Sequence, residues 1–257
     1  MTDGAELDAL LARRAQVHRV TSRSPMQSLE DLEEWLTEQG ITLVSGRSAV
    51  PSAAEAIAGE TIAGSWWSHR QGGAIYRLLT ELEERTQWLD VALVEGKHTL
   101  VAPAARLPLA RLAADEERRA RVVAGLPPPA RRLWDVVSSG EEVRSDDPRF
   151  AGKSWRPARQ ALEAGLLVRS RSEHQDAGHH VATVTTFGEQ PEPGSDKALG
   201  SVLGQCLHSA VVAETREVLR WLRYVEPLKS LIETAISDLA VRALNVDGRT
   251  WLTPAER

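Results

Sequence analysis

One arrangement of elements recurs three times along this chain and constrains its fold more than any other feature. Each copy has two helical segments followed by two short strand-like runs joined by a turn. The spacing of apolar residues separates the two kinds of element, because a helix face repeats every three to four residues and a strand face every second residue. We expect the helices at 51–59 and 72–85, at 128–140 and 153–167, and at 214–225 and 228–244. We expect the hairpins at 89–102, 168–187 and 245–252.

Local signals place several element ends. Ser28 with Asp31 three residues later matches a helix N-cap, and Gly40 is a natural stop for the helix that follows Ser28. Glu95-Gly96 and Asp247-Gly248 are typical of tight hairpin turns.

Two helices and a two-stranded wing form the winged-helix plan, so the predicted fold class is mainly α with small β-wings (α+β), as three tandem winged-helix units. The Pro-rich run 126–130 and the Pro- and Gly-rich stretch 188–200 are candidate linkers. The predicted domains are an N-terminal helical segment at 1–49, a first unit at 50–115, a second, basic unit at 116–190 and a third unit at 191–257.

Composition limits the class of protein. The 257 residues are 42% hydrophobic and 26% charged, which is ordinary for a globular protein. Cys206 is the single cysteine, so an internal disulfide is excluded and a reducing compartment is favoured. No apolar run is long enough to span a bilayer, and the N-terminus lacks the features of a secretory signal. We therefore expect a soluble cytoplasmic protein.

The charge is unevenly distributed. Residues 118–172 contain twelve basic side chains against six acidic ones, a net charge of +6 in a chain whose total is −5. A basic middle within an acidic chain is typical of a nucleic-acid-binding face. A solvated arginine-rich helix surface would give the same count.

The helix expected at 153–167 is the candidate recognition helix, because in helix-turn-helix proteins such a helix enters the major groove. Pro157 suits the first turn, which places the residues before it at the helix entry. Arginine and glutamine side chains can read guanine and adenine, and they can equally contact phosphates. The candidate DNA-binding residues on this helix are Lys153, Ser154, Trp155, Arg156, Arg159 and Gln160.

The hairpin at 168–187 supplies the candidate wing, and a polar hairpin in water remains the alternative. Its candidate DNA-binding residues are Arg169, Arg171, His174, His179 and His180. The three histidines raise the possibility of a zinc site, but no cysteine is near and their spacing is not a helical His-x-x-x-His pair. We predict no metal and no cofactor.

The segment 64–73, GSWWSHRQGG, is the most unusual local sequence. Adjacent side chains on a helix or strand diverge, so Trp66 and Trp67 are expected to point in different directions. The segment is either a packed loop or a second binding surface, in which His69 and Arg70 accompany a ring that stacks on exposed bases.

No catalytic motif is visible: the chain has no G-x-S-x-G elbow, P-loop, G-x-G-x-x-G or H-E-x-x-H. Cys206 and His208 are two residues apart and would diverge on a helix, so a small buried side chain is the expected role of Cys206. Whether the chain is an enzyme stays open, with the sequence favouring a non-catalytic role.

The chain resembles the tandem winged-helix DNA-binding proteins of bacteria, a group that includes crosslink-repair DNA glycosylases. The resemblance covers roughly residues 50–253 and rests on LWDVVSSG, SWRPARQALEAGLLVRSRSEH and GHH in the second unit and VLRWLRYV and VDGRTWL in the third. It implies duplex binding, in DNA repair or transcription regulation. Those glycosylases carry a catalytic Gln-x-Asp or Gln-x-Gln motif, and no glutamine here has such a partner, so their chemistry is not carried over.

Two hypotheses follow. The first is a DNA-binding protein that uses the middle helix and wing on duplex DNA. The second is a winged-helix scaffold that binds another protein through its acidic surfaces and no nucleic acid. A membrane partner is not expected.

Overall fold

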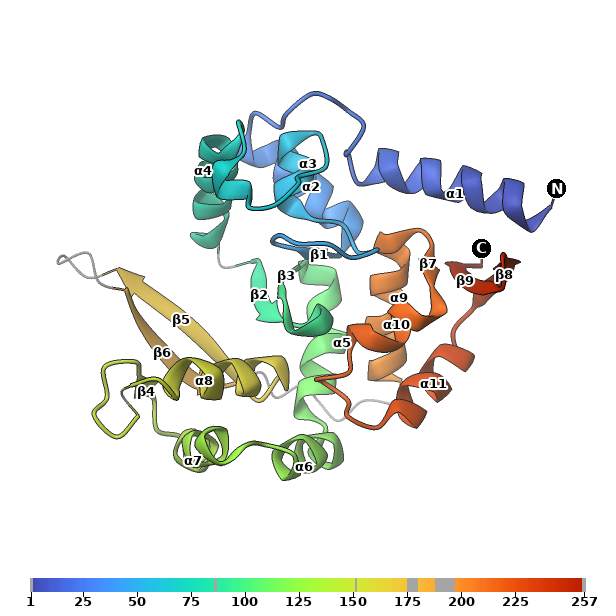
Figure 1. Cartoon of the computed structure of the whole chain (residues 1–257). Coiled ribbons are helices and arrows are strands. Elements are labelled where there is room, and N and C mark those ends of the chain that lie inside the picture. The colour runs from blue at the N-terminus through green and yellow to red at the C-terminus, as the bar shows by residue number, and fades with distance from the viewer. Residues whose placement is uncertain (1, 86, 151, 175–179, 188–196, 256–257) are drawn as a thin grey trace.

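The computed structural model describes residues 2–85, 87–150, 152–174, 180–187 and 197–255. Within these residues the threefold pattern appears as three separate three-stranded antiparallel sheets (Figure 1). In each sheet the last strand of the hairpin lies in the middle, with the order β1-β3-β2, β4-β6-β5 and β7-β9-β8. The sheets are therefore hairpins widened by one short strand that precedes them along the chain.

The first unit runs from α2 to β3. Its elements are α2 (Leu29–Gln39), β1 (Ile41–Leu43), α3 (Ala53–Ala58), a 3₁₀ turn (Trp66–Ser68), α4 (Gly72–Glu83), β2 (Leu89–Ala92), a second 3₁₀ turn (Val94–Gly96) and β3 (His98–Val101). Ser28 Oγ accepts the Asp31 N–H at 3.1 Å, and Gly40 ends α2 with φ +76°, which confirms both predicted caps. Strand β1 precedes residue 50, yet it pairs with β3 in the sheet of this unit, and α2 packs in the core of the unit with α3 and α4.

The second unit runs from α7 to β6 and keeps the same order. Its elements are α7 (Pro128–Val137), β4 (Val143–Arg144), α8 (Trp155–Ala164), β5 (Val168–His174) and β6 (His180–Thr186). Leu133 and Val137 of α7 pack against Leu162 of α8 in a small core of their own.

The third unit runs from α9 to β9. Its elements are α9 (Ala198–Ala210), β7 (Ala213–Glu214), α10 (Thr215–Trp221), α11 (Lys229–Ser237), β8 (Val241–Val246) and β9 (Arg249–Pro254). The stretch 188–200, expected as a linker, contains the start of α9, and its residues 188–196 lie outside the described part of the chain.

The helix expected at 228–244 is wrong in its second half. Helix α11 ends at Ser237, and Val241–Val246 forms β8, which pairs with β9 from Val241↔Pro254 to Val246↔Arg249. Leu244 is buried at the centre of this strand. Tertiary pairing therefore overrides a helical spacing that continues past Ser237 in the sequence.

Two helices connect the units. Helix α5 (Pro103–Ala114) lies in the middle of the molecule and packs against α9, and α6 (Glu116–Ala124) follows it at the edge of the second unit (Figure 1). Leu109 and Leu112 of α5 share the largest core with Val202 and Trp221 of the third unit. This core also includes residues of β1–β3, so the first and third units are joined by apolar packing.

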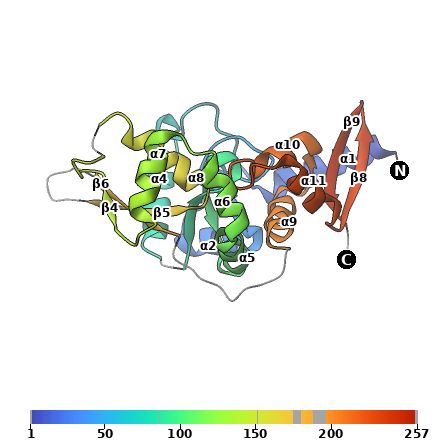
Figure 2. The ribbon, with the colours of Figure 1, turned by 90° about the horizontal axis from the view of Figure 1, so that it is seen from below.

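Helix α1 (Asp3–Val17) lies on the third unit, beside β8 (Figure 2). The Asp3 carboxylate accepts the Asn245 N–H at 2.9 Å, and Arg14 Nη1 donates to the Val212 carbonyl at 3.0 Å. Buried Leu7 packs with Leu244 and Val212. The first helix thus covers the last hairpin of the chain.

Among the described residues, no helix combines the length and the apolar character that crossing a bilayer requires. No group of three or more His, Cys, Asp or Glu side chains in this part of the chain could hold a metal ion.

Candidate nucleic-acid interface

Most arginines of the basic segment 118–172 are engaged within the protein. Exposed examples pair with carboxylates within eight positions in the sequence: Arg131 with Asp135 at 3.0 Å, Arg144 with Asp146 at 3.0 Å, and Arg149 with Asp147 and Glu141. The net charge of the segment therefore overstates the charge available to a phosphate backbone.

Arg118 is the extreme case, because its side chain is completely buried. Its Nε donates to the Leu112 carbonyl at 2.7 Å and its Nη2 to the Ala113 carbonyl at 3.2 Å, at the end of α5. Its Nη1 donates to the carbonyls of Gly165 (2.8 Å) and Val225 (3.0 Å), which follow α8 and α10. Burial lowers its pKa to about 10, so the guanidinium is still charged at neutral pH. Arg118 thus joins the second and third units to the connecting helices.

Helix α8, the predicted recognition helix, has two different faces. Arg156 and Gln160 are exposed and lie one turn apart on the outer face. Arg159 lies on the inner side: its side chain is 21% exposed and forms an ion pair with Glu163 at 3.6 Å. Arg159 and Glu163 lie close enough to His98 of the first unit for their charges to affect the pKa of His98. Helix α8 also packs against β2 of that unit. The inner face of α8 is therefore an internal contact between units.

The entry to α8 is open to solvent. Lys153 and Ser154 are exposed, whereas Trp155 is half-buried and packs near Phe150, with ring centroids 6.5 Å apart. Within the described residues, no ion pair involves Lys153, Arg156 or Arg171. These three cations remain available to an external ligand.

The β5–β6 hairpin supplies the next residues. Arg169 and Arg171 alternate along β5 opposite Thr185 and Thr183, so both point to the same face of the ribbon. Arg169 lies over the Phe187 ring at 6.0 Å, and Arg171 is exposed. The His174 and His180 backbones are paired in the ladder. The side chains of His174 and His180, and His179 as a whole, lie outside what the structure describes.

The three hairpins differ in what they contact. The turn of the first hairpin lies against α10, where a β-carbon at Gly96 would be 3.3 Å from the Tyr224 ring. The third is covered by α1, as described above. The β5–β6 hairpin extends away from the rest of the molecule (Figure 1). This hairpin belongs to the unit that carries the exposed Lys153, Arg156 and Arg171.

The tryptophan turn differs from its expected geometry. The rings of Trp66 and Trp67 stack, with centroids 4.0 Å apart and an interplanar angle of 23°, so the expectation that they diverge is wrong. The reason is the 3₁₀ turn Trp66–Ser68, whose backbone is neither an α-helix nor a strand. His69 and Arg70, the expected polar partners, both contact Glu60, at 3.3 Å and 2.7 Å.

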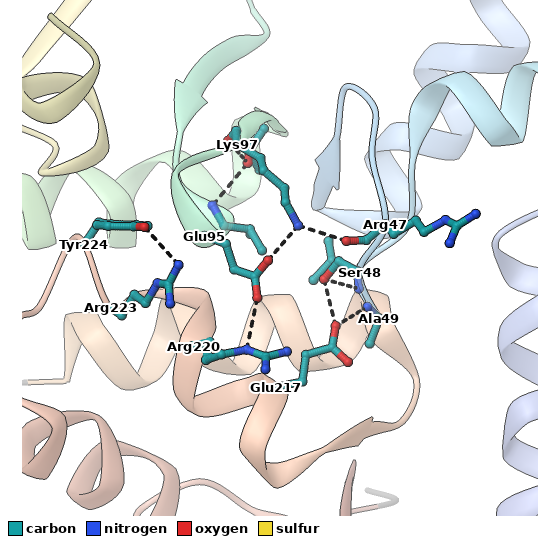
Figure 3. Close-up of polar contacts among 12 residues, drawn as sticks. Arg47, Ser48, Ala49, Glu95, Lys97, Glu217, Arg220, Arg223 and Tyr224 are labelled. Atoms are coloured by element: carbon teal, nitrogen blue, oxygen red, sulfur yellow. Dashed lines mark hydrogen bonds and ion pairs between the residues drawn. The ribbon is translucent and has the colours of Figure 1, made fainter. Parts of the chain in front are cut away.

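A polar network between the first and third units was not predicted from the sequence (Figure 3). Ser48 Oγ and the Ala49 N–H both donate to the Glu217 carboxylate of α10, Ser48 at 3.0 Å. Lys97 Nζ donates to Glu95 at 2.6 Å, and Arg220 Nε lies 3.4 Å from the same carboxylate. The contacts that Glu217 and Arg220 make with the first unit join residues more than 100 positions apart, so no local pattern could have indicated them.

Electrostatics stabilises this network. Burial alone would raise the pKa of Glu95, but the hydrogen bond from Lys97 and the charges of Lys97 and Arg220 together lower it. A pocket of about 340 Å³ adjoins the network and is lined in part by Arg14, Arg47 and Trp251. Lys97 and Arg220 lie against the two oxygens of Glu95, and one oxygen of Glu217 accepts from Ser48 and Ala49, so the arrangement joins the two units.

Cys206 is fully buried in α9, and burial raises the pKa of its thiol to about 12. His208 is exposed, so the two side chains do not form a reactive pair.

Comparison with protein-family models and with curated protein sequences gives no match. Among solved structures, the chain is similar to Streptomyces sahachiroi DNA glycosylase AlkZ, with a TM-score of 0.54 and 16% sequence identity. The likeness covers 96% of this chain and 69% of that one. At this identity it establishes a shared fold along almost the whole chain and leaves the chemistry to be argued from the residues.

Proposed function

We propose that this protein binds duplex DNA through the outer face of α8 and the β5–β6 hairpin. The observation that carries the proposal is the coincidence of two features in one unit. The described strands β5 and β6, which extend away from the other units, belong to the same unit as Lys153, Arg156 and Arg171, three exposed cations with no ion pair among the described residues. The similarity to a DNA glycosylase along 96% of the chain supports a role on DNA, and we propose that this role lies in DNA repair.

We also propose that each of the three units is a winged helix. In every unit a helix precedes a short strand, one or two further helices follow, and a hairpin closes a sheet with the same strand order. On this proposal the units span 29–101, 128–186 and 198–254. These proposed spans differ from the expected 50–115, 116–190 and 191–257 mainly in the first unit, where the pairing of β1 with β3 brings α2 into the unit.

The proposal assigns different roles to the predicted contact residues. Arg156 and Gln160 face the groove, with geometry suited to base edges, while Lys153, Ser154 and Arg171 contact phosphates. Trp155 and Arg159 support α8 from inside and are no longer proposed as contacts.

The test is fluorescence anisotropy with a labelled duplex between about 50 and 200 mM salt. The double variant Arg156→Ala/Arg171→Ala should weaken binding about tenfold or more. It should reduce the slope of log K against log salt by about one, because Arg171 is the phosphate contact of the pair and each phosphate contact releases roughly one counterion. The matched control is Arg77→Ala/Arg131→Ala, which removes the same charge from arginines paired with Glu81 and Asp135.

Equal losses in the two double variants would mean that net charge, and not this face, governs binding. No affinity for any duplex at the lowest salt would overturn the proposal and favour the alternative, a scaffold that binds another protein through its acidic surfaces.

A further inference from the structure

The turn between α3 and α4 exposes aromatic surface that the proposed duplex contact does not use. Trp67 is 64% exposed and Tyr76, on the first turns of α4, is 49% exposed. Their ring centroids are 5.4 Å apart, and Trp67 stacks on Trp66. We call Trp66, Trp67 and Tyr76 the aromatic shelf. Solvent exposure of large rings is unfavourable, so a shelf of this kind calls for an explanation beyond folding.

The shelf is held in place from below. Trp66 is half-buried and packs against the core of the first unit. The His69 N–H donates to the Trp66 carbonyl at 3.1 Å, and the Gly72 N–H donates to the His69 carbonyl at 2.8 Å. At Gly72 a β-carbon would lie 3.0 Å from the carbonyl oxygens of both tryptophans, so the turn approaches α4 as closely as it does only because glycine stands there.

A second brace comes from the side. Arg70 donates through Nε and Nη2 to Glu60, at 2.9 and 2.7 Å, and His69 contacts the same carboxylate. Several hydrogen bonds and ion pairs therefore hold the turn that carries the two tryptophans. This lowers the conformational entropy that would be lost when a ligand binds to the rings.

The chemistry of the shelf indicates the kind of ligand. Trp and Tyr side chains bury about 150–250 Å² each, so two partly exposed rings offer roughly 200 Å², far below the about 800 Å² per partner of a stable protein interface. The residues that flank the two tryptophans in the sequence, Ser65 and Ser68, are small and polar. The flanking charges of Arg70 and Arg77 are matched by Glu60 and Glu81. A small planar ring that stacks without electrostatic attraction fits these features.

We propose that the aromatic shelf stacks on an unpaired nucleobase of a DNA strand bound by the protein. This inference rests on the proposed function and extends it, because it makes DNA with an unpaired base a better ligand than a perfect duplex. Stacking of bases on aromatic side chains is tolerant of sequence, and it adds affinity that does not depend on counterion release.

The experiment compares a perfect duplex, the same duplex with a single-strand tail, a single strand, and a free nucleoside monophosphate, each by anisotropy or competition. For the wild type, we expect the tailed duplex to bind about tenfold or more tightly than the perfect duplex. Trp67→Ala should remove that preference, leave the salt slope unchanged and leave affinity for the perfect duplex within about twofold. Trp67→Phe should retain most of the preference, and Leu107→Ala, which removes an exposed apolar side chain of α5, should retain all of it.

The outcomes separate the two proposals. If Arg156→Ala/Arg171→Ala weakens duplex binding but Trp67→Ala leaves the affinity for every DNA ligand unchanged, the shelf proposal is overturned and the proposed function stands. If the free nucleotide competes for the shelf as well as the strand does, the site takes nucleotides and not a DNA strand. If no DNA binds at all, both proposals fall.

Discussion

Arginines of one short segment behave in opposite ways at two places in this molecule. At the junction of the units, Arg118 is completely buried and donates to four backbone carbonyls, and Arg121 pairs with the buried carboxylate of Glu226 at 2.8 Å. On the second unit, Arg156 and Arg171 are exposed and have no ion-pair partner among the described residues. A basic segment in the sequence therefore indicates a candidate binding face only when its buried, structural arginines are distinguished from its exposed ones.

The largest expected effect belongs to the junction. Arg118→Leu should lower the free energy of unfolding by about 3–5 kcal/mol, because it leaves buried carbonyls of α5, α8 and the α10 end without donors. Urea denaturation measures this loss. Arg118→Lys should recover less than half of it, since an ammonium cannot reach the same set of carbonyls as the guanidinium fork. A loss below about 1 kcal/mol for Arg118→Leu would show that the buried arginine is dispensable.

The next largest expected effect is a pH-dependent loss of stability at the contact between His18 and α9. His18, at the end of α1, hydrogen-bonds through Nε2 to the Ser209 carbonyl of α9 at 2.8 Å, and burial lowers its pKa to about 4. The unfolded chain binds a proton to this histidine near pH 6.5 while the folded chain does not, so the stabilisation present above pH 6.5 is lost as the pH falls toward 4. We expect a loss of about 2–3 kcal/mol between pH 7.5 and 4.5.

Denaturation of wild type and His18→Gln across this range checks the expectation. The variant should start less stable at pH 7.5 and show a flatter pH dependence. Parallel curves for the two proteins would mean that other groups cause the acid sensitivity.

Glu226 and Glu117 offer a matched pair on a single arginine. Both lie within ion-pair distance of Arg121, but Glu226 is 3% exposed and Glu117 is 91% exposed. Glu226→Gln should cost about 1–3 kcal/mol of unfolding free energy, and Glu117→Gln less than about 0.5 kcal/mol, because solvent screens the exposed pair. Thermal unfolding of both variants measures the contrast, and similar melting temperatures would contradict it.

These contrasts show what the sequence could and could not predict. The repeated plan, the caps at Ser28 and Gly40 and the two hairpin turns are encoded by neighbouring residues, and their positions were predicted. Strands β1, β4 and β7 were missed, because two or three residues carry no period and their partner strands lie about 40 to 60 positions away.

The same distinction between local signals and packing applies to the candidate site. The sequence points to α8 and its hairpin as the candidate DNA contact, which stays a prediction, and the structure leaves Lys153, Arg156 and Arg171 of these elements exposed. It could not separate Arg156 from Arg159, because which side of α8 faces the first unit is decided by packing between units. The stack of Trp66 on Trp67 was missed for a related reason: a 3₁₀ turn brings adjacent rings together, and the sequence did not indicate such a turn.

Arg159 provides the smallest effect and the sharpest test of the comparison. It lies on the same helix as Arg156, three residues away, and carries the same charge, but it faces inward beside Glu163 and its Nε is buried without a hydrogen-bond partner. Arg159→Ala should therefore change duplex affinity by less than about twofold, against about tenfold or more for the exposed pair. Its unfolding free energy should shift by at most about 1 kcal/mol, because the lost ion pair and the relieved burial of an unpaired donor oppose each other. Anisotropy and denaturation on the same sample decide the point: if Arg159→Ala weakens DNA binding as much as Arg156→Ala does, the inner face of α8 opens toward DNA and the division between structural and available arginines fails on this helix.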